Sequence, residues 1–142
     1  MHHGALTLSA TLFGAAIVAF AATCVAAHSV GYLIDETFRV VTIEGNPAAA
    51  EQTLAFAVDG TVRGSTGCNT FSTGIRVDGH EMSIGNPRLT RRACPAPLMD
   101  AERAFLDALA KVGAFEIELD DNRLILFDTA GVAELTLTRV PR

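Results

Sequence analysis

The sequence has little charge, and none of it lies near the amino terminus. Only 19% of the 142 residues are charged, tryptophan is absent, and the first Asp, Glu, Lys or Arg is Asp35. The formal net charge of −5 therefore belongs to the chain after Leu33. An acidic domain argues against binding of nucleic acid in a basic groove. Only Arg88, Arg91 and Arg92 form a local basic cluster, and this cluster is a candidate site for binding an anion.

The amino-terminal segment is almost continuously apolar. Residues 4–27 carry no charged side chain, so this segment is expected to meet lipid or the export machinery. We interpret residues 1–29 as a signal peptide or a membrane anchor. Small residues before His28 favour cleavage, whereas the absence of Lys and Arg from the first residues argues against it. Cys24 follows three small residues and is a candidate for lipidation, although Thr23 departs from the lipoprotein pattern.

Short β-like runs separated by turn residues follow this segment. Asp59-Gly60 and Asp78-Gly79 tolerate the backbone of tight hairpin turns and separate pairs of such runs. The pattern predicts an antiparallel meander of about seven to eight short strands. The expected strands are residues 37–43, 53–58, 61–65, 75–78, 81–84, 115–119, 123–127 and about 134–138.

One amphipathic helix interrupts the strands. Residues 87–97 are expected to form a connecting loop, and apolar residues from Leu98 to Val112 then recur at spacings of three and four. Gly113 is expected to cap the helix, and Glu102 to lie on its solvated face. A helix inserted into a meander must cover an apolar sheet face. The expected fold class is α+β: a bent antiparallel meander or partly open barrel packed on one helix.

Three segments in this order resemble the META domain of the HslJ-like family. The first is Gly64-Ser65-Thr66-Gly67-Cys68-Asn69-Thr70-Phe71-Ser72, the second is Leu89-Thr90-Arg91-Arg92-Ala93-Cys94-Pro95, and the third is an acidic helix from Met99 to Leu109. The chain departs from the family at Phe38, where Trp is usual, and at Thr73, where Gly is common. The resemblance assigns residues 36–141 to a META-like domain.

The resemblance implies a domain of the bacterial envelope. The family includes heat-shock-associated lipoproteins linked to antibiotic tolerance, and its fold is similar to the cracked barrel of secretin pilotin lipoproteins, which hold lipid in a cavity. No catalytic residue or cofactor is established for the family, so none is carried over. The implied location is exported, either periplasmic or membrane-anchored.

Cys68 and Cys94 are the two cysteines of the expected domain. An exported protein meets an oxidising compartment, so a disulfide between them is the preferred interpretation. It would close a loop of about 25 residues, which chain-entropy models value at about 3 kcal/mol. The alternatives are two buried free thiols, a zinc site with His80, and a nucleophilic pair of Cys94 or Cys68 with His80. The zinc site lacks a fourth ligand.

The remaining candidates surround these cysteines. Gly64, Gly67 and Asn69 are expected to build a structural turn, with the Asn69 side chain bonding to the backbone. Arg91 and Arg92 could contact an anion or partner, or could pair with the nearby acids Asp100 and Glu102.

The sequence therefore favours a non-enzymatic envelope protein, a stress-related binding or structural module for a hydrophobic ligand or partner protein. The alternative is a small thiol-dependent enzyme using Cys94 or Cys68 with His80. No metal, cofactor or nucleic acid is expected. Membrane association through residues 1–29 is expected if that segment is retained or lipidated.

Overall fold

The computed structural model describes residues 31–142. The expectations for residues 1–29 and for lipidation of Cys24 lie outside the described residues. Within residues 31–142, no helix has the length and apolar character needed to cross a membrane.

Ten strands and one long helix follow a short helical turn at residues 31–33. The elements in chain order are β1 (Thr37–Ile43), β2 (Asn46–Pro47), β3 (Thr53–Phe56), β4 (Thr61–Ser65), β5 (Thr70–Asp78), β6 (Glu81–Ile84), β7 (Arg88–Leu89), α2 (Ala96–Lys111), β8 (Val112–Glu118), β9 (Arg123–Asp128) and β10 (Ala133–Arg139).

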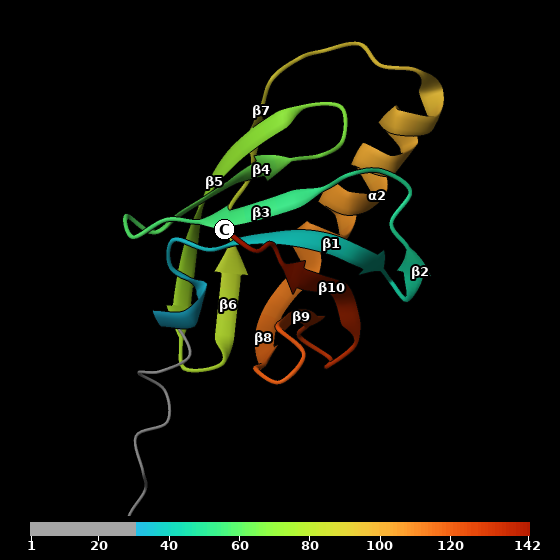
Figure 1. The fold of residues 1–142 in the computed structure, drawn as a ribbon. Coiled ribbons are helices and arrows are strands. Elements are labelled where there is room, and N and C mark those ends of the chain that lie inside the picture. Colours follow the sequence, from blue (N-terminus) through green and yellow to red (C-terminus); the bar gives the residue numbers. More distant parts are fainter. Residues whose placement is uncertain (1–30) are drawn as a thin grey trace, which may run out of the picture.

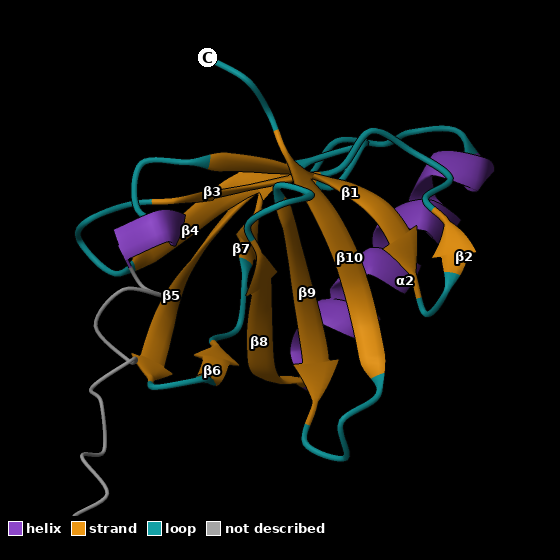
Figure 2. Cartoon of the chain, turned by 60° about the horizontal axis from the view of Figure 1, so that its bottom comes forward, coloured by secondary structure: helices purple, strands orange, loops and turns teal. Residues whose placement is uncertain are grey.

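Eight of these strands close into an antiparallel barrel. The hydrogen-bonded order runs β10, β9, β8, β6, β5, β4, β3 and β1, and β1 pairs back with β10. The two-residue strands β2 and β7 pair only with β1 and β5. The strands curve around a common interior in Figure 2. The α+β barrel expected from the sequence is confirmed, with the closure supplied by the first and last strands.

The seam between β6 and β8 is the weakest in the barrel. The two strands share one residue pair, Glu81 with Ala114, and the Phe115 amide donates to the His80 carbonyl just outside β6. By contrast, β8 and β9 pair over six residues. The barrel is thus closed, but few backbone hydrogen bonds hold the seam between β6 and β8.

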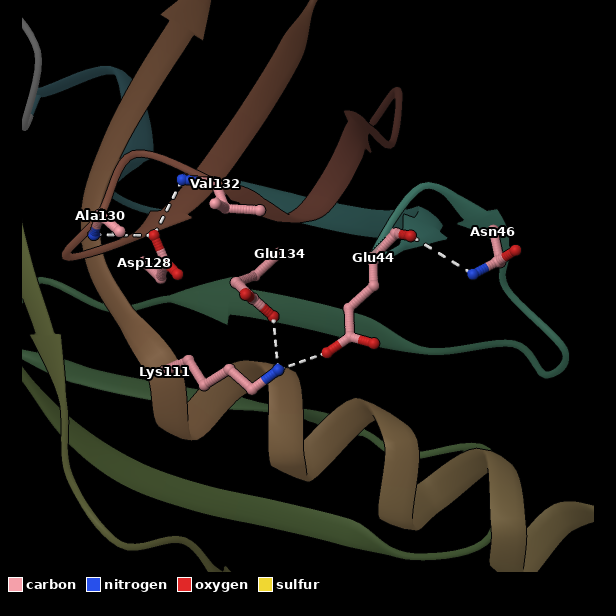
Figure 3. Close-up of polar contacts among 7 residues, drawn as sticks. All are labelled: Glu44, Asn46, Lys111, Asp128, Ala130, Val132 and Glu134. Carbon is pink, nitrogen blue, oxygen red and sulfur yellow. Dashed lines mark hydrogen bonds and ion pairs between the residues drawn. The ribbon is translucent and has the colours of Figure 1, made fainter.

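Tight turns set the register of the hairpins. Gly60 and Gly79 have φ angles of 76° and 60°, which glycine adopts without steric cost. In the β9–β10 turn, Asp128 Oδ1 accepts hydrogen bonds from the Ala130 and Val132 amides, both at 2.8 Å (Figure 3). Because the side-chain period in a strand is two, each fixed turn also decides which residues face the core.

The core fills the barrel interior and the space under α2. Phe38, Leu54 and Phe105 are completely buried. The Phe105 ring of α2 lies 5.8 Å from the ring of Phe71 on β5, which joins the helix to the barrel. Helix α2 and the turn at residues 31–33 lie on opposite sides of the barrel in both overall views (Figures 1 and 2). The amphipathic stripe is therefore core, as the sequence predicts.

Three local predictions were wrong. Helix α2 passes into β8 without a loop, and Val112 rather than Gly113 stands at the cap. Gly113 lies in β8, where a Cβ would be 2.7 Å from Thr129 Cγ2. Glycine at this position therefore allows β8 to pack closely against Thr129. Strand β5 begins at Thr70, five residues before the expected start. The short strand β7 lies inside the expected loop, because its two residues pair with β5.

Candidate functional site

The three segments that carry the family resemblance meet at one place. The structure contains the favoured disulfide between Cys68 and Cys94, with the Cα atoms 6.0 Å apart. It ties the β4–β5 turn to the chain just before α2. Neither sulfur is then available as a thiolate nucleophile.

The histidine of the alternative enzyme lies apart from this site. His80 is exposed in the β5–β6 turn, and its ring lies 6.3 Å from the Phe115 ring. Within residues 31–142, no three His, Cys, Asp or Glu side chains gather closely enough to hold a metal ion.

Asn69 is the centre of a buried hydrogen-bond network beside the disulfide. Its Nδ2 donates to Glu102 Oε2 at 2.9 Å and to Oε1 at 3.2 Å. Its Oδ1 accepts from the Arg92 amide at 2.8 Å and from Thr90 Oγ1 at 2.9 Å. Asn69 is 4% exposed, so these partners replace water almost completely. One amide side chain thus links the turn, the segment before the helix, and the helix.

Two further buried side chains hold α2 to the same turn. The Thr66 hydroxyl donates to Glu102 Oε2. Gln52 Nε2 donates to the carbonyls of Ala101 at 2.9 Å and Thr66 at 3.2 Å. Glu102 is only 8% exposed, so its expected place on the solvated face of the helix was wrong. The carboxylate is buried because Thr66 and Asn69 supply the donors that water would otherwise give.

The two glycines of the expected turn have different roles. Gly67 has a φ angle of 93° and lies in the turn, as expected. Gly64 lies within β4 rather than in the turn. A Cβ on Gly64 would lie 1.8 Å from the Thr53 carbonyl oxygen, so glycine lets β3 and β4 approach.

Arg91 and Arg92 do not pair with the acids nearest in sequence. Asp100 pairs with Arg103 at 3.2 Å, and Glu102 is held by Thr66 and Asn69. Both arginine side chains are exposed. Of the two alternatives for these arginines, pairing with the nearby acids was therefore wrong. This segment contributes to the network through the backbone amide of Arg92.

Ion-pair clusters also lie outside the network, and two of them join distant parts of the chain. Lys111, at the end of α2, reaches Glu44 and Glu134, the second at 3.2 Å (Figure 3). Hydrogen bonding to Lys111 lowers the pKa of Glu44, and the same carboxylates raise the pKa of Lys111. Arg139 binds both oxygens of Glu36, at 2.6 and 2.8 Å. That hydrogen bonding holds the pKa of Glu36 below its ordinary value.

The Glu36–Arg139 pair predicts acid sensitivity. Because folding lowers the pKa of Glu36 from about 4.5, the unfolded chain binds more protons as the pH falls through this range. The pair should therefore stabilise the fold above pH 4.5 and lose its effect as Glu36 becomes protonated. We expect Arg139→Gln to lower the free energy of unfolding at pH 7, and the difference from wild type to narrow below pH 4.5. Urea unfolding at several pH values measures this, with the exposed Arg76→Gln as control; an unchanged difference at low pH would contradict it.

A small apolar cleft opens beside the turn at residues 31–33. Its volume is about 140 Å³. The lining residues are Leu33, Ile34, Phe56, Ala57, Val58, Gly60, Ile75 and Val77. Val58 stands at its rim and is 72% exposed. None of these residues was predicted to line a cleft, and Gly60 was expected only in a hairpin turn, because the cleft brings together β3, β5 and the amino-terminal turn.

Comparison with known proteins gives a family and a fold. The family model described as the META domain matches residues 32–141. An NMR structure of a protein from Burkholderia xenovorans is 21% identical, with a TM-score of 0.65, over 100% of this chain and 99% of that chain. A crystal structure of a DUF4847 family protein from Bacteroides vulgatus is 17% identical, with a TM-score of 0.54, over 75% of this chain and 93% of that chain. No curated protein matches the chain.

Proposed function

The chain belongs to the META domain family, and on this premise we propose that it is a non-enzymatic binding module of the bacterial cell envelope. The state of the cysteines supports the absence of catalysis, because a thiol enzyme needs a free thiolate and the disulfide removes both sulfurs. The position of His80 in an exposed turn supports it further. The apolar segment at residues 4–27 supports export, and the family resemblance supports a stress-related role, which we include in the proposal.

The size of the apolar cleft indicates which class of ligand the protein binds. Pockets for whole small molecules usually measure about 300 to 1,000 Å³, and this cleft measures about 140 Å³. The barrel interior is filled by its own side chains, among them Phe38 and Leu54. A cleft of this size suits one apolar side chain of a partner protein, a common way for interfaces to anchor. We therefore favour a partner protein over a hydrophobic small ligand.

Photocrosslinking tests the proposed contact. We expect the full chain carrying p-benzoylphenylalanine in place of Val58 to form one protein adduct of defined mass in intact cells. The matched control places the same residue at Val132, which is 56% exposed in the β9–β10 turn. Position 132 should give no such adduct. Equal adducts at both positions, or none at position 58, would contradict a partner at the cleft.

The same cells allow the proposed export to be measured. The intact mass of the protein recovered from the envelope distinguishes removal of residues 1–29, retention of that segment, and acylation at Cys24. Recovery of the full-length protein from the cytosol alone would contradict the proposed location.

A further inference from the structure

The outer face of β4, β5 and β7 carries two arginines on either side of a serine. In the strand register, Arg63 pairs with Ser72, and Ser72 pairs with Arg88. Alternation along each strand places these three side chains on the outer face, since Val62, Phe71 and Thr73 face the core. Neighbouring strands lie about 4.8 Å apart, so the two arginine Cα atoms are about 10 Å apart, within joint reach of one small ligand above Ser72.

Hydroxyl groups lie at the edge of an open, shallow hollow at this place. Thr70 and Thr90 stand in the next row along the strands, where the Thr70 amide donates to Thr90 Oγ1 at 3.1 Å. The hollow measures about 480 Å³ and is lined by both arginines together with Thr70, Ser72 and Thr90. No carboxylate residue lines it.

Positive charge is concentrated around this hollow, whereas the domain as a whole carries a net negative charge. All eleven Lys and Arg residues lie within residues 31–142, and six of them lie within 4.0 Å of a carboxylate. Of the other five, Arg88, Arg91 and Arg92 belong to β7 and the segment directly after it. The carboxylate partner of Arg63 is Asp59 at 3.8 Å, with both side chains exposed, so this contact is weak. Positive charge therefore collects here in a chain of net charge −5.

We propose that this face binds a phosphate group between Arg63 and Arg88. The planar guanidinium fork offers paired donors that match phosphate oxygens, and the hydroxyls of Ser72 and Thr70 can donate to the oxygens that remain. The Thr90 hydroxyl is already used, because it donates to Asn69 Oδ1. The phosphate belongs to a phosphoester, either a soluble one or the headgroup of an anionic lipid. This site is separate from the apolar cleft and does not depend on the proposed partner.

Amide NMR shifts of the full chain test the site. The protein is held in dodecyl maltoside micelles, which contain no phosphate, and is titrated with inorganic phosphate at constant ionic strength. We expect saturable shifts at the Ser72 and Arg88 amides. Arg63→Gln and Arg88→Gln should each weaken binding by about tenfold, the usual effect of losing a charge-assisted hydrogen bond. The matched control is Arg39→Gln, an exposed arginine of β1 for which wild-type affinity is expected.

Two results would overturn the proposal. The first is a set of amide shifts that grow linearly with phosphate concentration and do not saturate. The second is an equal loss of phosphate affinity in the Arg39→Gln control and in the two site variants. A second arm adds phosphatidylglycerol to the micelles. Shifts at Ser72 that depend on Arg63 and Arg88 would identify a lipid headgroup as the source of the phosphate. Saturable binding of inorganic phosphate without a response to the lipid would identify a soluble phosphoester.

Discussion

Replacing Asn69 by alanine is expected to lower the free energy of unfolding by about 3 to 5 kcal/mol. The Asn69 amide is 4% exposed and donates to both oxygens of Glu102. Its removal leaves that buried carboxylate with Thr66 as its remaining side-chain donor, and it strips the Arg92 amide of its acceptor. Burial of a charge without donors is among the most destabilising single changes. Urea unfolding followed by circular dichroism measures the effect.

A matched asparagine provides the control. Asn46 is exposed, and its side chain makes one hydrogen bond, to the Glu44 carbonyl at 3.3 Å (Figure 3). Asn46→Ala should therefore change stability by less than about 0.5 kcal/mol. If both alanine variants unfold at the same urea concentration, the Asn69 network does not hold the fold together.

The Cys68→Ser/Cys94→Ser double variant is expected to lose about 3 to 4 kcal/mol of stability. The two residues are 26 apart in sequence, and a bridge across such a loop removes many conformations of the unfolded chain. Wild-type protein under a reducing agent should unfold at nearly the same urea concentration as the variant. Binding at either proposed site should be kept under conditions where the variant is folded. A loss below about 1 kcal/mol, or loss of binding in a folded variant, would contradict a purely structural bridge.

The disulfide and the Asn69 network together explain why the family segments occur in one chain. The turn supplies Cys68 and Asn69, the segment before the helix supplies Cys94 and the Arg92 amide, and α2 supplies Glu102. Linked, they hold the first turns of α2 against the β4–β5 turn, and this placement lets Phe105 reach Phe71. In this chain, the three segments therefore form a structural clamp built from the disulfide and the Asn69 network.

Sequence patterns predicted the regular strands well. The bounds of β1, β4 and β6 agree with those expected, because alternating residues and a turn glycine mark each of them. The helix was also predicted, since its apolar stripe has the helical period. These elements depend on neighbours in sequence, so local patterns contain the information needed.

Other features depend on contacts that local patterns do not contain. The first half of β5 is rich in hydroxyl residues and was not expected as strand; it is held extended by β4 on one side and β7 on the other. Glu36 and Arg139 are 103 residues apart and meet through the pairing of β1 with β10. Glu102 was assigned to solvent because its helical position gave no sign of the donors across the clamp. All three environments are created by tertiary contacts between segments that are distant in sequence.

We infer that Cys68 and Cys94 are bridged within the clamp and supply no reactive thiol. Peptide mapping after alkylation, carried out on denatured but unreduced protein from the envelope, tests this most directly. We expect one bridged species that joins the peptides containing Cys68 and Cys94, with neither cysteine alkylated. Quantitative alkylation of both residues in that material would show two free thiols and would contradict the account.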